Sequence, residues 1–295
     1  MKQSTRSKYS VGNLIIGFFI LLFSLICLFP LVLTLMVSIT DESSIMRYGY
    51  SLFPHKFSGF AYQLMFQRGS SVLHGTAVSI FVTVVGTFFA VLITGFAGYT
   101  LSNKSVKYRN ALAMYFFIPM VFSAGIVPWY LICTALKLRN NIWALLIPNL
   151  LFNPFNLFLT RNYMDGIPDS LRESATMDGA NDFIIAFRIY FPLCMPVLAT
   201  IALFYGLAYW NDWWNAIMLV DDKNYYPIQY LLLQLKSQIS MLRDLQFLSG
   251  TGSVTPPSES LKMATAIVTI GPIILLYPFL QRYYVKGLVI GSVKG

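Results

Sequence analysis

The sequence predicts an all-α membrane protein with six transmembrane helices, and composition is the first observation behind that fold class. Apolar residues make up 56% of the 295 residues and charged residues only 11%, whereas soluble domains carry about 25% charged residues. Long uncharged runs are the second observation, and the third is that basic residues gather in short segments beside those runs. The net charge of +9 therefore indicates membrane topology rather than a nucleic-acid surface, and no nucleic-acid partner is expected.

Six apolar segments are long enough to cross a bilayer, whose hydrocarbon core takes about 20 helical residues. The first is uncharged from Asn13 to Ile39 and exceeds the apolar core of a signal peptide, which is about 7–15 residues long, so we expect it to be retained. The predicted spans are residues 13–39, 72–101, 110–135, 142–160, 191–220 and 263–281. They define a transmembrane domain from residue 13 to residue 282, between tails at 1–12 and 283–295.

The basic flanks set the orientation. In a six-span topology the N-terminal tail, the link between the second and third spans and the C-terminal tail share one side of the membrane. Each carries three basic residues: Lys2, Arg6 and Lys8; Lys104, Lys107 and Arg109; Arg282, Lys286 and Lys294. Because short loops rich in Lys and Arg stay in the cytoplasm, both termini and residues 166–190 are predicted to be cytoplasmic. The short link with Lys137 and Arg139 opposes the trend but is outnumbered.

Residues 166–190 lie outside the spans yet have the pattern of a folded helical segment. Ser170 and Glu173 have the spacing of a capping box, in which both side chains satisfy free N–H groups at a helix start. Pro168 is an alternative first residue of this helix. Gly179 is placed to end it in a left-handed conformation.

A second short helix is expected directly after Gly179. Either Asn181 or Asp182 can cap its N-terminus through a side-chain oxygen. Pro192 and Pro196 then lead back into apolar sequence. Taken locally, the segment is a capped pair of short helices that meet at an elbow.

The same residues resemble a family pattern, the EAA loop of the permeases of ABC importers. The resemblance rests on Glu173, Ser174, Ala175, Asp178, Gly179, Ala180, Phe187, Ile189 and Pro192. Ser174 replaces the usual Ala, but both residues are small. The resemblance implies that the loop forms coupling helices that dock on an ATPase subunit. The residues implied in that coupling are Glu173, Ser174, Ala175, Asp178, Gly179, Ala180, Asn181 and Pro192.

Two further stretches extend the resemblance over nearly the whole chain. Residues 122–130 read FSAGIVPWY and are similar to a signature of permeases for oligosaccharides and polysaccharide fragments, with Ala124 in place of a Gly. Residues 257–266, 280–288 and 291–295 resemble the end of the same group, the relatives of the maltose importer's second permease subunit. The implied fold is that of an ABC type I importer permease in the bacterial cytoplasmic membrane. The implied partners, besides membrane lipid, are a second homologous permease, two copies of a cytoplasmic ATPase and an extracellular or periplasmic sugar-binding protein.

The chain lacks the motifs of an enzyme. The Gly-rich stretch that begins at Gly250 lacks the Lys of a phosphate-binding loop, so ATP and Mg²⁺ are expected on the partner ATPase and no cofactor in this chain. Three cysteines without a short spacing argue against a disulfide framework or a metal site. His55 and His74 have no companion ligand at helical or turn spacing, and no catalytic or metal-binding residue is expected.

The densest polar and aromatic cluster lies in the second half of the fifth predicted span. The residues of interest are Tyr209, Trp210, Asn211, Asp212 and Trp214. One interpretation is an aromatic belt at the headgroup level. The other is a sugar path, because amides and a carboxylate are costly toward lipid and favour a cavity. Both interpretations remain open at this point.

The sequence therefore favours a permease subunit of an ATP-driven importer for a carbohydrate, with an oligosaccharide preferred. The alternatives are an ABC permease for a different solute, a secondary transporter and, last, a membrane-embedded enzyme. The enzyme would need converging acid, base or metal groups inside the membrane, for which Asp212 is the one candidate. Dependence of uptake on a separate ATPase separates the ABC permeases from the secondary transporter.

Overall fold

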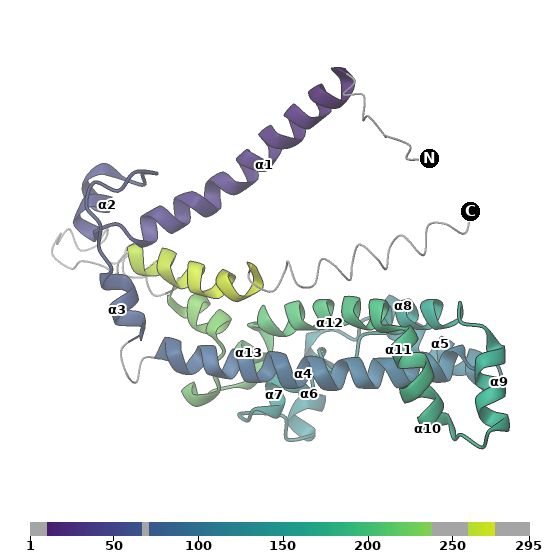
Figure 1. Ribbon diagram of the computed structural model, residues 1–295. Coiled ribbons are helices and arrows are strands. Elements are labelled where there is room, and N and C mark those ends of the chain that lie inside the picture. The colour runs from purple at the N-terminus through teal and green to yellow at the C-terminus, as the bar shows by residue number, and fades with distance from the viewer. Residues whose placement is uncertain (1–10, 67–70, 236, 238–258, 275–295) are drawn as a thin grey trace. The chain divides into compact units, whose positions relative to one another are not determined.

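A computed structural model describes residues 11–66, 71–235, 237 and 259–274 (Figure 1). The tail up to residue 10, the Gly-rich stretch at residue 250, the last predicted span beyond residue 274 and the tail at 283–295 lie outside the described residues. Within the described ranges the regular elements are helices, with one isolated antiparallel bridge between Thr40 and Phe57. The all-α prediction is confirmed. The chain divides into two units, residues 1–67 with 236–268 and residues 68–235 with 269–295.

The first unit begins with α1 (Val11–Ser38), which matches the first predicted span. Its 28 residues correspond to about 42 Å of helix at 1.5 Å per residue, enough to cross a bilayer. None of the residues in its most apolar 18-residue stretch is buried. An apolar helix exposed all round requires lipid or another protein around it.

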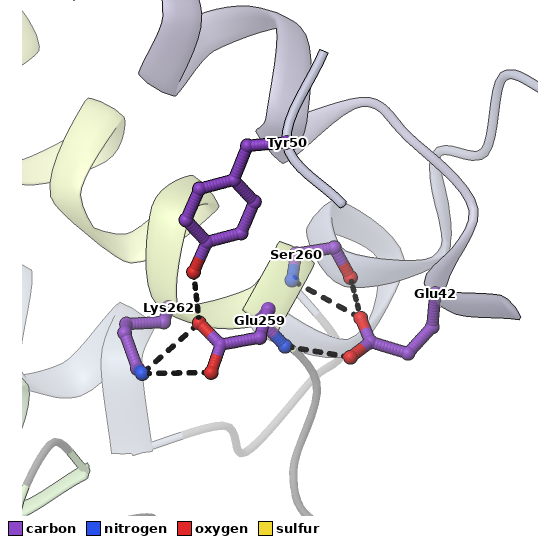
Figure 2. Close-up of polar contacts among 5 residues, drawn as sticks. All are labelled: Glu42, Tyr50, Glu259, Ser260 and Lys262. Atoms are coloured by element: carbon purple, nitrogen blue, oxygen red, sulfur yellow. Dashed lines mark hydrogen bonds and ion pairs between the residues drawn. The ribbon is translucent and has the colours of Figure 1, made fainter. Parts of the chain in front are cut away.

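Short helices α2 (Glu42–Tyr48) and α3 (Phe60–Phe66) complete the first unit together with residues 259–268 of the helix at 259–274. The Glu42 carboxylate accepts hydrogen bonds from the backbone N–H groups of Glu259 (2.8 Å) and Ser260 (3.1 Å) (Figure 2). It thus satisfies free donors at the start of that helix. The Glu259 carboxylate in turn accepts from the Tyr50 hydroxyl at 2.7 Å and contacts the Lys262 ammonium at 3.0 Å. This polar cluster fastens the segment after α1 to the start of the 259–274 helix.

The second unit is built around α4 (Ser71–Ser102), which contains the second predicted span and packs along α12 (Met195–Trp210) and α8 (Pro154–Met164) (Figure 1). Two glycines allow the helices to approach closely. A Cβ on Gly86 would overlap the ring of Tyr209, and a Cβ on Gly98 would lie 2.8 Å from the Thr160 side chain. Side chains at these positions would force α4 away from its neighbours.

The remaining helices of the second unit are short or broken. They are α5 (Arg109–Val121), α6 (Ile126–Ala135), α7 (Trp143–Leu146), α9 (Asp169–Met177), α10 (Asp182–Ile185), a π-helical turn at Ala186–Tyr190, α11 (Phe191–Leu193), α13 (Trp214–Leu219), a 3₁₀ turn at Lys223–Tyr225 and a helix at 228–235. Among the described residues, α1 and α4 are long and apolar enough to span a membrane unbroken. The number rises to at most four if each of two bent helix pairs counts as one broken span. These pairs are α5 with α6, which are bent by 118° at their break, and residues 182–193 with α12, which are bent by 86°.

The break in the predicted span 110–135 lies in the FSAG stretch. Gly125 precedes α6 with φ +84°, a conformation that residues with a Cβ rarely adopt. The predicted span 142–160 consists of α7, an irregular stretch and α8, whereas 191–220 contains α11, α12 and α13. The six-span topology remains a proposal, which these breaks do not exclude because backbone irregularities are tolerated beside protein or a cavity.

Candidate functional site

The elbow predicted at Gly179 is present between α9 and α10. Gly179 has φ +81°, and its N–H donates to the carbonyl of Thr176 at 3.0 Å. The N–H of Ala180 donates to the carbonyl of Ala175, also at 3.0 Å. This pair of bonds is the Schellman motif that ends a helix with a left-handed residue. The predicted left-handed helix end at Gly179 is confirmed.

The N-terminal caps of the two helices differ in part from the prediction. Asn181 accepts a hydrogen bond of 2.9 Å from the N–H of Ile184, so Asn181, not Asp182, caps α10. The predicted capping box of Ser170 and Glu173 is wrong. The α9 helix already begins at Asp169, with Pro168 as its N-cap and no side-chain cap, so Ser170 lies inside the helix, where its hydroxyl cannot cap. Asp169 instead places a negative charge in the first turn, which the helix dipole favours.

An aromatic cluster packs the second half of the segment on α4. The ring centroid of Phe96, on α4, lies 5.2 Å from that of Phe183, 5.6 Å from that of Phe187 and 5.1 Å from that of Phe191. Aromatic pairs at such distances contribute about 0.5–1.5 kcal/mol beyond the area that they bury. Because Phe183, Phe187 and Phe191 follow one another at helical spacing, α10, the π-helical turn and α11 present one continuous aromatic face to α4.

A hydrogen bond lies beside this cluster. The Tyr99 hydroxyl, on α4, donates to Asp182 Oδ1 at 2.8 Å. The Tyr99 ring also meets the Tyr190 ring edge to face, with centroids 4.9 Å apart. Tyr99 and Tyr190 are buried, so this contact fixes the direction in which α10 leaves the elbow.

The first half of the segment is connected to the link after α4. Lys104 Nζ lies 2.7 Å from Asp169 Oδ2, and Arg172 donates to the Ser105 hydroxyl at 3.0 Å. The hydrogen bond from Lys104 lowers the pKa of Asp169, and the same bond raises the pKa of Lys104. Both halves of the 166–190 segment are therefore attached to α4 or to the residues that follow it.

The predicted coupling residues fall into two sets. Glu173, Ser174, Asp178, Gly179, Asn181 and Pro192 are exposed, whereas Ala175 and Ala180 are half-buried against the core. Beside the exposed set lies Met177, whose side chain is 88% exposed at the end of α9.

Sequence reasoning missed the residues that hold this segment in place. Phe96, Tyr99 and Lys104 lie on α4 or just after it, more than 60 residues earlier in the chain. Phe96 and Tyr99 are ordinary residues of an apolar span, and Lys104 reads as a topology signal. The only available signal was the helical spacing of Phe183, Phe187 and Phe191.

The predicted substrate-path cluster is divided between interior and surface. Tyr209 and Trp210 are 2% and 5% exposed. The Tyr209 hydroxyl donates to the carbonyl of Leu146 at 2.8 Å, and Trp210 Nε1 donates to the carbonyl of Thr269 at 2.9 Å. Within this chain these two rings join helices to one another.

The other three residues of the cluster remain accessible. Asn211 is exposed and its Oδ1 accepts from Gln229 Nε2 at 3.1 Å, whereas Asp212 and Trp214 are half-buried. Asp212 Oδ1 accepts from the backbone N–H groups of Trp214 (3.1 Å) and Asn215 (3.3 Å) at the start of α13. Its Oδ2 is buried without a hydrogen-bond partner in the described part of the chain. The amides of Asn211 and Gln229 could therefore bind hydroxyl groups, whereas the Asp212 carboxylate holds the start of α13 and its Oδ2 is buried.

Over the residues that the structure describes, no group of three or more His, Cys, Asp or Glu residues is placed to hold a metal ion. His74 Nε2 lies 2.7 Å from the carbonyl of Asn224, and the His55 ring packs on Tyr48 with centroids 4.4 Å apart.

The chain matches a known family over residues 86–290, described as "Binding-protein-dependent transport system inner membrane component". It is 37% identical to the polygalacturonan/rhamnogalacturonan transport system permease protein YtcP of Bacillus subtilis (strain 168), over 98% of this chain and 100% of the relative. It is 27% identical to the arabinooligosaccharides transport system permease protein AraQ of the same organism, over 98% of both chains.

A solved structure has the same fold over nearly its full length. The crystal structure of a bacterial ABC transporter involved in the import of the acidic polysaccharide alginate contains a chain that superposes with a TM-score of 0.79. The two chains are 28% identical, and the match covers 94% of this chain and 99% of the other.

Proposed function

This chain belongs to the family of binding-protein-dependent transport system inner membrane components, and we propose that the solute it helps to carry is an oligosaccharide. It is a multi-pass permease subunit of an ABC importer in the inner membrane and not an enzyme. In this family the ATPase is a separate chain.

The carbohydrate assignment rests on one observation. YtcP is named for polygalacturonan/rhamnogalacturonan transport and AraQ for arabinooligosaccharide transport, and both align with this chain over almost its entire length. The exposed amide of Asn211 and the half-buried Gln229 and Trp214 support it, because hydroxyl groups need hydrogen-bond partners and the C–H faces of sugars pack on aromatic rings. Asn211 and Trp214 are therefore the proposed substrate contacts of this subunit, with Asp212 holding the start of α13 and with Tyr209 and Trp210 fixing the helices behind them.

The 166–190 segment is the proposed docking site for the ATPase. The exposed residues Glu173, Asp178 and Met177 surround the elbow at Gly179, and the opposite side is packed on α4 through Phe96. A displacement of the elbow by the ATPase would therefore move α4, and α12 with it, because those two helices pack along each other. No covalent chemistry is required of this chain.

The remaining partners are also proposals. The exposed apolar surface in the first two-thirds of α1 suits a second, homologous permease together with membrane lipid. Two ATPase subunits with bound ATP and Mg²⁺ would dock from the cytoplasm, where both termini are placed by the basic flanks. A sugar-binding protein would deliver the solute from the opposite side.

Uptake measurements test the proposed solute. Cells that carry the complete importer are expected to take up labelled oligogalacturonides or arabinooligosaccharides, and cells without this chain are not. The matched control is a cell in which only the ATPase is inactive, which should behave like the deletion. Uptake of an amino acid or peptide by the complete importer, with no uptake of any oligosaccharide, would overturn the carbohydrate assignment.

A further inference from the structure

A basic pocket lies at the start of α5 and shares Lys104 with the contacts of the 166–190 segment. Its volume is about 330 Å³, and it is lined by the link between α4 and α5 and the first turn of α5. Lys104, Lys107 and Arg109 contribute three positive charges, and Tyr108 and Asn110 complete the polar lining. A volume of this size accommodates a phosphate group with its neighbouring atoms.

The charge of the pocket is only partly neutralised. Lys104 forms an ion pair with Asp169, so three cations and one carboxylate leave two positive charges. Within the described ranges neither Lys107 nor Arg109 forms an ion pair; Lys107 Nζ lies 5.4 Å from the centroid of the Tyr108 ring. The sequence contains no Asp or Glu between Glu42 and Asp165. The pocket is therefore suited to an anion supplied from outside the chain.

The helix that leaves the pocket is apolar and exposed. No residue of α5 is buried, and Met114, Tyr115 and Ile118 are 60%, 67% and 50% exposed. Tyr108, at the rim, is 66% exposed, and amphipathic rings favour the headgroup level of a membrane. A ligand with a charged head in the pocket and apolar chains along α5 would satisfy both surfaces.

We propose that this pocket binds the phosphate headgroup of an anionic phospholipid. Lys107 and Arg109 contact the phosphate and acidic headgroup oxygens, Asn110 donates a further hydrogen bond and the acyl chains lie along α5. Basic pockets beside transmembrane helices bind such headgroups through these contacts. A free phosphate shares the headgroup chemistry but cannot use the apolar surface of α5, so the lipid is the expected ligand.

The measurement is lipid retention by the complete importer, extracted in mild detergent from vesicles of equal parts phosphatidylcholine and phosphatidylglycerol. Native mass spectrometry is expected to show phosphatidylglycerol retained in preference to phosphatidylcholine. Lys107→Gln combined with Arg109→Gln should weaken that retention about 30-fold, because each cation near the surface contributes about 1 kcal/mol. Lys107→Arg combined with Arg109→Lys keeps both charges and should retain the lipid.

Two controls make the result specific. Lys137→Gln combined with Arg139→Gln removes the same charge from another link of the chain and should leave retention unchanged. Excess inorganic phosphate should not displace the lipid. Any one of four results would overturn the proposal. The wild type could retain the two lipids equally, or the glutamine variant of Lys107 and Arg109 could retain as much lipid as the wild type. The control variant could lose as much lipid as that glutamine variant, or inorganic phosphate could displace the lipid. Lipid retention is read without transport, so a failure of sugar uptake would count against the proposed function alone.

Discussion

Tyr99 donates a hydrogen bond of 2.8 Å to Asp182, although 83 residues separate them. One residue lies on α4 and the other at the start of α10, so the bond joins a long helix to the elbow proposed to dock the ATPase. Phe96 lies three residues before Tyr99 and packs on the same elbow. An aromatic contact and a directional hydrogen bond thus act on one side of α4.

The first prediction removes the directional part of that contact. Tyr99→Phe keeps the ring and its packing on Tyr190 but loses the hydroxyl, which should lower stability by about 0.5–1.5 kcal/mol. ATPase co-purification should persist while solute-stimulated ATP turnover falls. Tyr115→Phe, at an exposed tyrosine of α5, is the matched control. Wild-type turnover in Tyr99→Phe would show that the bond takes no part in coupling.

A second prediction concerns the ion pair between Lys104 and Asp169. The pKa of Asp169 is lowered, so the contribution of its carboxylate to stability is present above the pKa of the unfolded chain and is lost as pH falls through the folded value. The pKa of Lys104 is raised, so its contribution is lost only as pH rises through its folded value. The pair is therefore complete near neutral pH.

Because both side chains are at the surface, salt should screen the pair. Asp169→Asn is expected to make the thermal stability of the importer less sensitive to acid and to salt. The charge-reversed double variant, Lys104→Glu with Asp169→Lys, should restore part of that sensitivity. The prediction would be contradicted if thermal stability depended on acidic pH in the same way in the wild type and in Asp169→Asn.

Local chemistry explains which parts of the site could be predicted. The helix end at Gly179 and a cap at either Asn181 or Asp182 could be predicted, because a left-handed helix end and an N-cap depend on residues a few positions away; only the structure selects Asn181. The Ser170 and Glu173 capping box failed because its pattern does not fix the first helical residue, and a start at Asp169 moves Ser170 into the helix. Phe96 and Tyr99 could not be found, because contacts over such sequence distances leave no local pattern in an apolar span.

The third prediction separates structural from solute-binding residues in the fifth span. Trp210 is buried and hydrogen-bonded to Thr269, so Trp210→Ala should cost about 3–5 kcal/mol of stability and reduce the amount of folded importer. Asn211 is exposed, so Asn211→Ala should leave the amount unchanged and lower sugar uptake. Uptake normalised to the amount of importer is the measurement. Normal uptake in Asn211→Ala would favour the aromatic belt over the sugar path.

The fourth prediction tests the polar cluster of the first unit (Figure 2). Glu42 accepts three hydrogen bonds, from the N–H groups of Glu259 and Ser260 and from the Ser260 hydroxyl. Glu42→Gln turns one acceptor into a donor that faces those N–H groups, so a loss of about 1–3 kcal/mol is expected. Protease cleavage within the helix at residues 259–274 should then become faster. Glu173→Gln, an exposed glutamate on α9, is the control, and equal cleavage rates would refute the role of Glu42.

The last prediction uses the open space around Gly179. A Cβ built there meets no atom within 4 Å, so within this chain a substitution suffers only from the left-handed backbone. That strain is about 1–2 kcal/mol for most residues and smaller for Asn. If the elbow did not contact the ATPase, the variants Gly179→Asn, Gly179→Ala and Gly179→Val should therefore bind the ATPase about equally well.

A docked ATPase changes that expectation, because any side chain at the elbow would then separate the two surfaces. Gly179→Asn should already weaken ATPase co-purification, and Gly179→Val should abolish both co-purification and sugar uptake while the chain still inserts. Gly49→Val, at a glycine with equally open space and φ +74°, is the matched control. Co-purification and uptake at wild-type levels in Gly179→Val would mean that the elbow does not face the ATPase, and the proposed coupling role of residues 166–190 would have to be abandoned.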